Sequence, residues 1–176
     1  EQDNDGPAPV NVALPAAADG YVRDGTYAGQ NFGQATVLEV KRVGAVGYSR
    51  ESYLRFDLAG VASADQITSA ALTLYGRMLS TAAPSLVVGL YPVADTTWAE
   101  SALTWATKPA AGAGPIATAT VAGTAGKAYA FDVTAYLKQQ KAAGATAVAF
   151  AVKAPAASEG WAGFDSDEGA NRPSLA

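Results

Sequence analysis

The sequence contains neither cysteine nor histidine. This absence excludes disulfide bonds, zinc fingers, histidine-ligated metals and the Ser-His-Asp and Cys-His nucleophile systems. Charged residues are also scarce, at 16% of the chain, whereas an average globular protein has about 25%. We therefore expect no long charged helix, and we expect any chemistry to come from carboxylates, hydroxyls, lysine, arginine and tyrosine.

Long hydrophobic runs are missing as well. No apolar stretch approaches the roughly 20 residues that a membrane-spanning helix needs, so no membrane insertion is expected. No signal peptide is visible at Glu1, which predicts either a cytosolic protein or one that is already processed. A chain of 176 residues can bury a core without covalent crosslinks, as one globular domain or two small ones.

The charge that is present is unevenly distributed. Residues 19–156 hold nine acidic and eleven basic residues, whereas both ends of the chain are acidic and bring the net charge to -4. A mildly basic body of this kind could meet an anionic partner. We do not expect that partner to be nucleic acid, because the net charge is negative and no nucleic-acid-binding motif is present.

Short β-type segments recur between turn signals from Asp19 onward. This spacing predicts an all-β antiparallel sandwich over residues 19–176, with one short helix over 133–142. Residues 1–18 combine acids, prolines and small residues without a sustained period, which indicates a linker or N-terminal extension. The predicted strands span 20–23, 36–42, 49–58, 66–77, 85–93, 115–121, 128–133 and 145–153.

Alternation along these strands predicts which side chains face the core. Leu54 and Phe56 alternate with Tyr53 and Arg55, so the first pair should point inward and the second pair outward. Arg50 breaks this alternation. It lies either at the rim beyond the strand end or in the interior beside a carboxylate such as Asp57 or Glu51. The outward set is rich in basic residues and tyrosine: Arg23, Lys41, Tyr53, Arg55, Tyr75, Arg77 and Lys153.

Several sequence blocks, taken in order, resemble one protein family. The blocks are YVRDGTYAGQNFG, LEVK, SRESYLRFDL, AALTLY, DTTWAESALTW, KPAAG, FDVTAYL and FAVK. Between about Ala17 and Pro173 they resemble the DNRLRE-type domain and its relative, the family 96 carbohydrate-binding module. The resemblance implies a jelly-roll sandwich that is covalently linked to the catalytic domain of a secreted, extracellular bacterial polysaccharide-degrading enzyme, chiefly a lyase. It further implies a non-catalytic, monomeric module that binds alginate or a similar uronate polymer.

The basic outward set fits such a ligand. A uronate polymer carries one carboxylate per sugar, which arginine can bind with two parallel hydrogen bonds and lysine as a point charge. The alternative is a solvated sheet face with cross-strand ion pairs. Trp161, in the glycine-rich segment SEGWAGF, could stack on a sugar or cover the core, whereas Trp98 and Trp105 should fix a long loop onto the sandwich. The predicted ligand-binding residues are Arg23, Lys41, Arg50, Tyr53, Arg55, Arg77, Lys153 and Trp161.

Acidic residues gather near both ends of the predicted domain. Calcium takes six to eight oxygen ligands, and the first and last strands of a sandwich commonly run side by side. We therefore predict a structural calcium site, with an acidic surface loop as the alternative. Residues 166–169 of the chain, Ser-Asp-Glu-Gly, depart from the Ser-Arg-Glu-Ala-like stretch that is common in the resembled family. The family's ligand contacts in that loop are therefore not assigned to these residues. The predicted metal ligands are Asp19, Asp165, Asp167 and Glu168.

Two other functions are compatible with the same residues. A lyase on a jelly-roll scaffold abstracts a proton with a tyrosine or lysine base while arginine neutralises the uronate carboxylate, and Tyr53, Lys41 and Arg55 could take these roles. Such sites usually add a histidine or an amide to polarise the carboxylate, and this chain has no histidine. A cell-surface structural or adhesion domain without glycan specificity is the remaining alternative, because a fold alone does not determine a ligand.

Overall fold

The computed structural model describes residues 8–61 and 63–176, and within these residues eleven strands pair in an entirely antiparallel arrangement. One α-helix, α1 (Thr134–Ala142), accompanies the strands, so the predicted all-β sandwich with a short helix is confirmed. No helix in the described part is long and apolar enough to cross a membrane. The strands are β1 (Leu14–Pro15), β2 (Ala18–Arg23), β3 (Val37–Lys41), β4 (Arg50–Asp57), β5 (Ala71–Met78), β6 (Ser85–Val93), β7 (Ala117–Ala122), β8 (Lys127–Asp132), β9 (Ala147–Lys153), β10 (Trp161–Asp165) and β11 (Ser174–Leu175).

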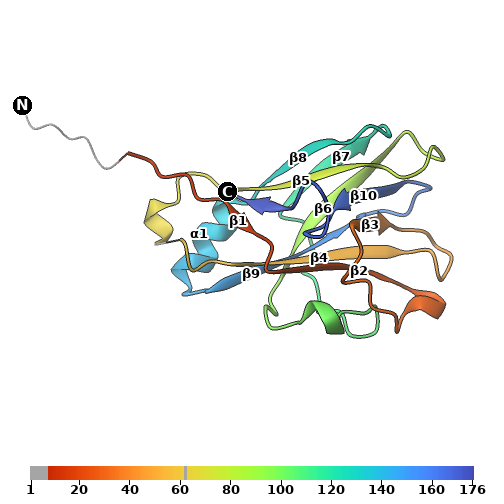
Figure 1. Ribbon diagram of the computed structural model, residues 1–176, viewed down its shortest axis with the longest axis horizontal. Helices are drawn as coiled ribbons and strands as arrows, with labels where there is room; N and C mark the ends of the chain where they lie inside the picture. The colour runs from red at the N-terminus through yellow and green to blue at the C-terminus, as the bar shows by residue number, and fades with distance from the viewer. Residues whose placement is uncertain (1–7, 62) are drawn as a thin grey trace, which may run out of the picture.

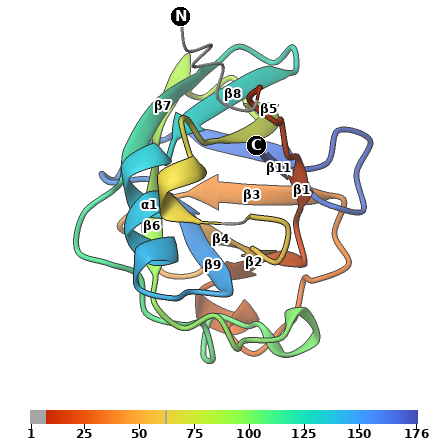
Figure 2. The same ribbon diagram turned by 90° about the vertical axis from the view of Figure 1, so that its left-hand side faces the viewer.

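The strands form two layers, which Figures 1 and 2 show from the side and from the end that carries α1. One layer contains β2, β4, β9, β6 and β7 in neighbouring positions. The other layer contains β3, β10, β5 and β8, with β11 and β1 continuing beside β5. A single pair, Lys41 with Arg50, joins β3 to β4 and so connects the layers.

The main core lies between the two layers. Alternating residues of each strand are buried there, as the sequence predicted for Leu54 and Phe56, which are both 0% exposed. Phe56 packs edge-on against Phe150 of β9, with the ring centroids 6.3 Å apart. Helix α1 covers one end of this core, where Tyr136 lies against the same Phe150 ring.

A second hydrophobic cluster covers the outer face of β4 and β9. The long connection from β6 to β7 carries the 3-10 helix η3 (Glu100–Ala102), drawn in green at the bottom of Figure 1, and folds over this face. Trp98 from this loop contacts Tyr53 edge-on at 6.4 Å. Tyr53 is therefore only 1% exposed, and the prediction that it points to solvent is wrong. Alternation gave the correct face, but the loop removes that face from solvent.

Three strands near the ends of the chain were not predicted from the sequence: β1, β10 and β11. β10 occupies the glycine-rich segment around Trp161 that was expected to be a loop. β1 and the first residue of β2 lie within residues 1–18, which were assigned to an extension, so the sandwich begins before residue 19. Residues 1–7 of that extension lie outside the described part of the chain.

Candidate functional site

A hollow of about 310 Å³ opens at the end of the sandwich away from α1. Three strand termini meet there: β3 ends at Lys41, β4 begins at Arg50 and β9 ends at Lys153. Because neighbouring antiparallel strands run in opposite directions, the register Lys41–Arg50 and Ser52–Val152 brings these termini together. The charged and aromatic residues that line the hollow are Lys41, Arg42, Arg50, Glu51, Trp105 and Lys153.

Aromatic rings hold the two lysines of the hollow. The ammonium nitrogen of Lys41 lies 5.4 Å from the centre of the Trp161 ring, and that of Lys153 lies 4.6 Å from the Tyr91 ring. Such cation–π contacts position an ammonium group without using its hydrogen-bond donors. Within the described residues neither lysine forms an ion pair. Both ammonium groups can therefore donate to an anionic ligand.

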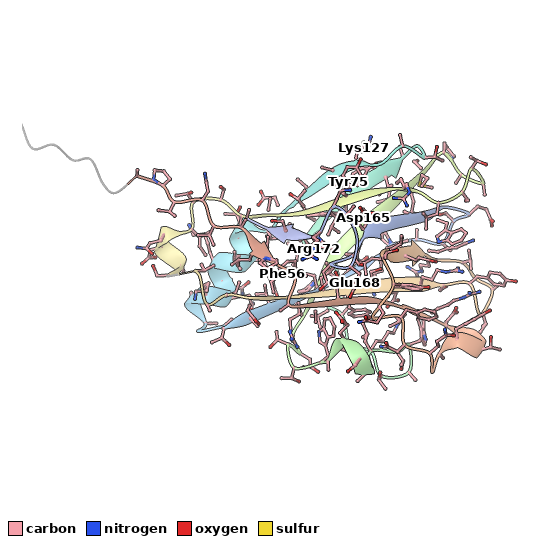
Figure 3. The ribbon with its side chains drawn as sticks, viewed as in Figure 1. Phe56, Tyr75, Lys127, Asp165, Glu168 and Arg172 are labelled. Atoms are coloured by element: carbon pink, nitrogen blue, oxygen red, sulfur yellow. The ribbon has the colours of Figure 1, made fainter. Side chains whose placement is uncertain are left out.

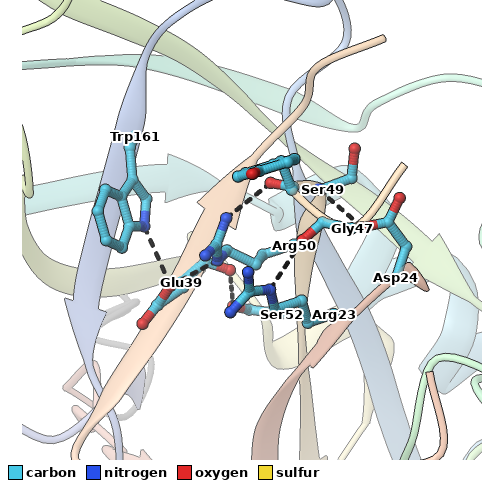
Figure 4. A network of polar contacts seen from close by, with 9 residues as sticks. Arg23, Asp24, Glu39, Gly47, Ser49, Arg50, Ser52 and Trp161 are labelled. Atoms are coloured by element: carbon cyan, nitrogen blue, oxygen red, sulfur yellow. Dashed lines mark hydrogen bonds and ion pairs between the residues drawn. The ribbon is translucent and has the colours of Figure 1, made fainter. Parts of the chain in front are cut away.

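Arg50 sits behind these lysines in a buried polar network (Figure 4). Its Nε lies 2.8 Å from Glu39 Oε2, and its Nη1 donates to the carbonyl oxygen of Tyr48 at 2.7 Å. Trp161 Nε1 donates to the same Glu39 oxygen at 3.1 Å, while the Arg50 guanidinium lies 4.9 Å from the Trp161 ring centre. Burial and the Glu39 carboxylate also raise the pKa of the neighbouring Tyr21 to about 12.

The network settles the two interpretations that the sequence left open for Arg50. The side chain is buried, with the residue 7% exposed, rather than placed beyond the strand end. Its carboxylate partner is Glu39, and the expectation of Asp57 or Glu51 is wrong. Asp57 lies at the opposite end of β4, and Glu51 points to the other face of that strand, where Lys108 pairs with it.

The β6–β7 loop contributes Trp105 to the lining of the hollow. Lys108 Nζ lies 2.7 Å from Glu51 Oε2 and 3.4 Å from the centre of the Trp105 ring. Trp105 was expected only to fix the loop, yet it also lines the hollow. The sequence did not indicate Arg42, which is next to Lys41, or Lys108, which is three positions after Trp105.

Tyr53 and Arg55 lie farther along β4, under the loop, and not in the hollow. The Tyr53 hydroxyl donates to Glu51 Oε2 at 3.0 Å, and burial together with the Glu51 charge raises the pKa of Tyr53. Arg55 Nη1 donates to the carbonyl oxygen of Trp98 at 2.6 Å, and its guanidinium lies 5.8 Å from the Trp98 ring centre. Both side chains therefore fasten the loop to the sheet. A tyrosine held in its protonated form is poorly suited to act as a base.

Replacing Arg55 by alanine should consequently destabilise the fold. The loop carbonyl of Trp98 would lose a charge-assisted donor, which costs about 1.5 to 3 kcal/mol of unfolding free energy. Urea unfolding followed by tryptophan fluorescence measures this loss. Arg172→Ala is the matched control, because Arg172 is exposed and its removal should change the free energy by no more than about 0.5 kcal/mol. Equal stabilities of the two variants would contradict the structural role of Arg55.

Arg23 and Arg77 also lie outside the lining of the hollow. Arg23 Nε donates to the carbonyl oxygen of Gly47 at 2.9 Å, and its guanidinium lies 3.7 Å from the Tyr27 ring centre. This contact ties the β3–β4 loop to β2. Arg77 Nη1, on β5, lies 3.6 Å from Asp165 Oδ1. The structure thus brings Lys41, Arg50, Lys153 and Trp161 together, and it places the other four predicted ligand-binding residues elsewhere.

Three of the four predicted metal ligands form a separate group that does not line the hollow. Carboxylate oxygens of Asp19, Asp167 and Glu168 all lie within 4.8 Å of one another. Asp165, labelled with Glu168 in Figure 3, is not in this group, because its Oδ2 accepts hydrogen bonds from Asn171 and its Oδ1 faces Arg77.

Burial and mutual repulsion perturb these carboxyl groups. Burial raises the pKa of Asp19 to about 8, and the charges of Asp167, Glu168 and Glu100 add to the effect. Burial and contact with Glu168 raise the pKa of Asp167 to about 6. The proximity of these acids therefore favours their protonated forms, and no ion pair within the described residues offsets their charge when they ionise.

The chain is similar to known proteins over most of its length. A gellan lyase from Bacillus sp. is 38% identical over 110 residues, a segment that makes up 61% of this chain and 4% of that protein. The chain thus spans a small part of the relative's length. The sequence profile of carbohydrate-binding module family 96 matches residues 10–176. Because this match spans nearly the whole chain, the chain belongs to carbohydrate-binding module family 96.

Proposed function

We propose that this module binds an acidic polysaccharide, of the uronate type found in alginate, at the hollow formed by the ends of β3, β4 and β9. The observation that supports this most strongly is the pair Lys41 and Lys153, whose ammonium groups are positioned by aromatic rings and lack ion-pair partners in the described residues. Arg42 adds a third cation to the same lining. A polymer with repeated carboxylates would supply the missing counter-charges.

The placement of the two lysines suits a chain molecule. Lys41 ends β3 and Lys153 ends β9, so the two lysines line the hollow from different strands. Carboxylates on separate sugars could therefore contact the two lysines at once. Trp105 gives the hollow an apolar wall against which the carbon-bound hydrogens of a sugar ring can pack.

The double variant Lys41→Ala/Lys153→Ala tests the site. Charge-assisted contacts contribute about 1.5 to 3 kcal/mol when desolvated and less in an open groove, so we expect affinity for alginate to fall at least about tenfold. Titration calorimetry at low salt measures this, with thermal melting to verify the fold. Lys138→Ala, on the exposed face of α1 at the opposite end of the sandwich, is the matched control.

The dependence of affinity on salt and on polymer type distinguishes binding through charge from non-specific binding. Binding should weaken as ionic strength rises, because exposed charge contacts are screened within about 10 Å at 0.1 M. A neutral glucan should bind weakly or not at all, and gellan, named in the Bacillus relative, is a second acidic probe. Unchanged alginate affinity in the double variant would place the site elsewhere. No binding to any acidic polymer would favour an adhesion domain without glycan specificity.

We further propose that the module works as a non-catalytic part of a longer, secreted polysaccharide-degrading enzyme, holding the enzyme on its substrate outside the cell. The supporting facts are the family match and the small share of the gellan lyase that the chain covers. Incubating the isolated domain with alginate and following the ultraviolet absorbance of unsaturated uronates tests this. We expect no increase, whereas sustained growth of absorbance would support the lyase alternative.

A further inference from the structure

An acidic group at the junction of β2 with the segment after β10 contains a feature that hydrogen bonding within the protein does not explain. Asp19 is 0% exposed, and its Oδ1 has no hydrogen-bond partner. The Oδ1 of Asp167 is likewise buried without a partner. A buried carboxylate oxygen that lacks a donor is costly, because it loses its hydration and gains nothing in return. Two such oxygens in one place point to a ligand that supplies positive charge.

The geometry fits a single cation. Calcium binds oxygens at about 2.3 to 2.6 Å, so two ligands of one ion are at most about twice this distance apart. One carboxylate oxygen from each of Asp19, Asp167 and Glu168 satisfies this condition, since all three lie within 4.8 Å of one another. We propose that these three residues bind one Ca²⁺ ion, which fastens the segment after β10 to β2.

Hydrogen bonds hold the segments that carry the three carboxylates close to one another. Asp19 Oδ2 accepts the backbone N–H of Asp167 at 2.8 Å, while Asp19 Oδ1 has no hydrogen-bond partner. The Ser166 hydroxyl lies 2.8 Å from Glu168 Oε2 and 2.7 Å from the carbonyl oxygen of Ala35. Glu100 Oε1 accepts the backbone N–H of Asp19 at 3.0 Å and adds a fourth negative charge nearby. An ion here would join segments 148 residues apart in the sequence.

The donor set favours calcium over other metals. All the donors are oxygens, and the chain has no cysteine or histidine for zinc or copper. Magnesium demands a near-ideal octahedron of short bonds and retains its water, whereas calcium accepts irregular sets of six to eight oxygens. A group built from one strand and one irregular segment meets the looser requirement.

Thermal melting with calcium or chelator tests the proposal on the intact chain. At 100 times its dissociation constant, calcium should raise the melting temperature by roughly 5 to 10 °C relative to chelator. Magnesium at the same concentration should produce a smaller shift. Identical melting of the wild type in calcium and in chelator would overturn the site, and an equal magnesium shift would overturn the choice of calcium.

The variant Asp167→Asn provides a second test, because it should weaken calcium binding without lowering the melting temperature in chelator. Asp167→Asn should lower calcium affinity at least about tenfold by titration calorimetry, because a ligand charge is lost. In chelator the same variant should melt at or above the wild-type temperature, since the repulsion of Asp19 and Glu168 is reduced. Glu168→Gln is a second, more exposed variant, and Asp57→Asn, an exposed acid on β4, is the matched control. Equal calcium affinity in Asp167→Asn and Asp57→Asn would refute the assignment.

Discussion

Replacing Phe56 by alanine is expected to lower the free energy of unfolding by about 3 to 5 kcal/mol. The Phe56 side chain, labelled in Figure 3, is fully buried between the two layers and packs edge-on against Phe150. Truncation would leave a cavity among strands that cannot close it, since β4 is held on both sides by hydrogen-bonded neighbours. Urea unfolding followed by circular dichroism measures the change.

Asp57→Ala supplies the control for Phe56→Ala at the next position of the same strand. Its side chain is exposed, so its loss should change the free energy of unfolding by no more than about 0.5 kcal/mol. Affinity for alginate should be unaffected in Phe56→Ala below its unfolding transition, because the hollow is formed by the other end of β4. A loss below about 1 kcal/mol in Phe56→Ala would contradict the close packing between layers.

The sequence predicted most of the fold because local patterns determine strands. Alternation around Leu54 and Phe56 identified the inward face correctly, and the predicted helix differs from α1 by a single residue. Strands without such a pattern were missed. β10 reads Trp-Ala-Gly-Phe-Asp, in which small residues replace the expected apolar positions, and Gly163 is required because a Cβ there would lie 2.6 Å from Val37.

Alternation along a strand predicts which face a side chain occupies, but it does not predict whether a loop covers that face. Tyr53 and Arg55 have the parity of exposed residues, yet the β6–β7 loop covers both. Ala149 and Ala151 on β9, both 0% exposed, leave the space that this loop fills. The regular alternation of alanine with large apolar residues along β9 was the available signal, since it leaves a face of small side chains that another segment can cover.

The remaining differences between the predicted and the observed candidate sites arise from the pairing of residues that are distant in the sequence. The prediction for Arg50 sought its partner within the same strand, but Arg50 pairs with Lys41 of β3, and this pairing brings Glu39 next to it. The grouping of Asp19 with Asp167 and Glu168 was accessible from topology, since first and last strands of a sandwich lie side by side. Asp165 could not be distinguished from Asp167 without the hydrogen bonds of Asn171.

The largest electrostatic effect is expected at Arg50. Arg50→Met should lower the free energy of unfolding by about 3 to 5 kcal/mol, because breaking a buried ion pair leaves its partner charge uncompensated. Glu39 would lose its cationic partner while keeping the Trp161 indole N–H as a donor, and the carbonyl oxygen of Tyr48 would lose the Arg50 donor. Chemical denaturation of the variant measures the loss.

A double variant distinguishes the effect of the unpaired Glu39 charge from the effect of losing the packing of the Arg50 side chain. Glu39→Gln in the Arg50→Met background removes the uncompensated charge while keeping an acceptor for Trp161. If the stranded Glu39 carboxylate causes the loss, the double variant should recover at least about 1.5 kcal/mol relative to Arg50→Met, as a coupling energy between residues in direct contact. Glu39→Gln alone should be destabilising, because it leaves Arg50 buried without its counter-charge. Strictly additive effects of the two substitutions would show that the pair is not coupled, and the network in Figure 4 would then be held by packing against Trp161 instead.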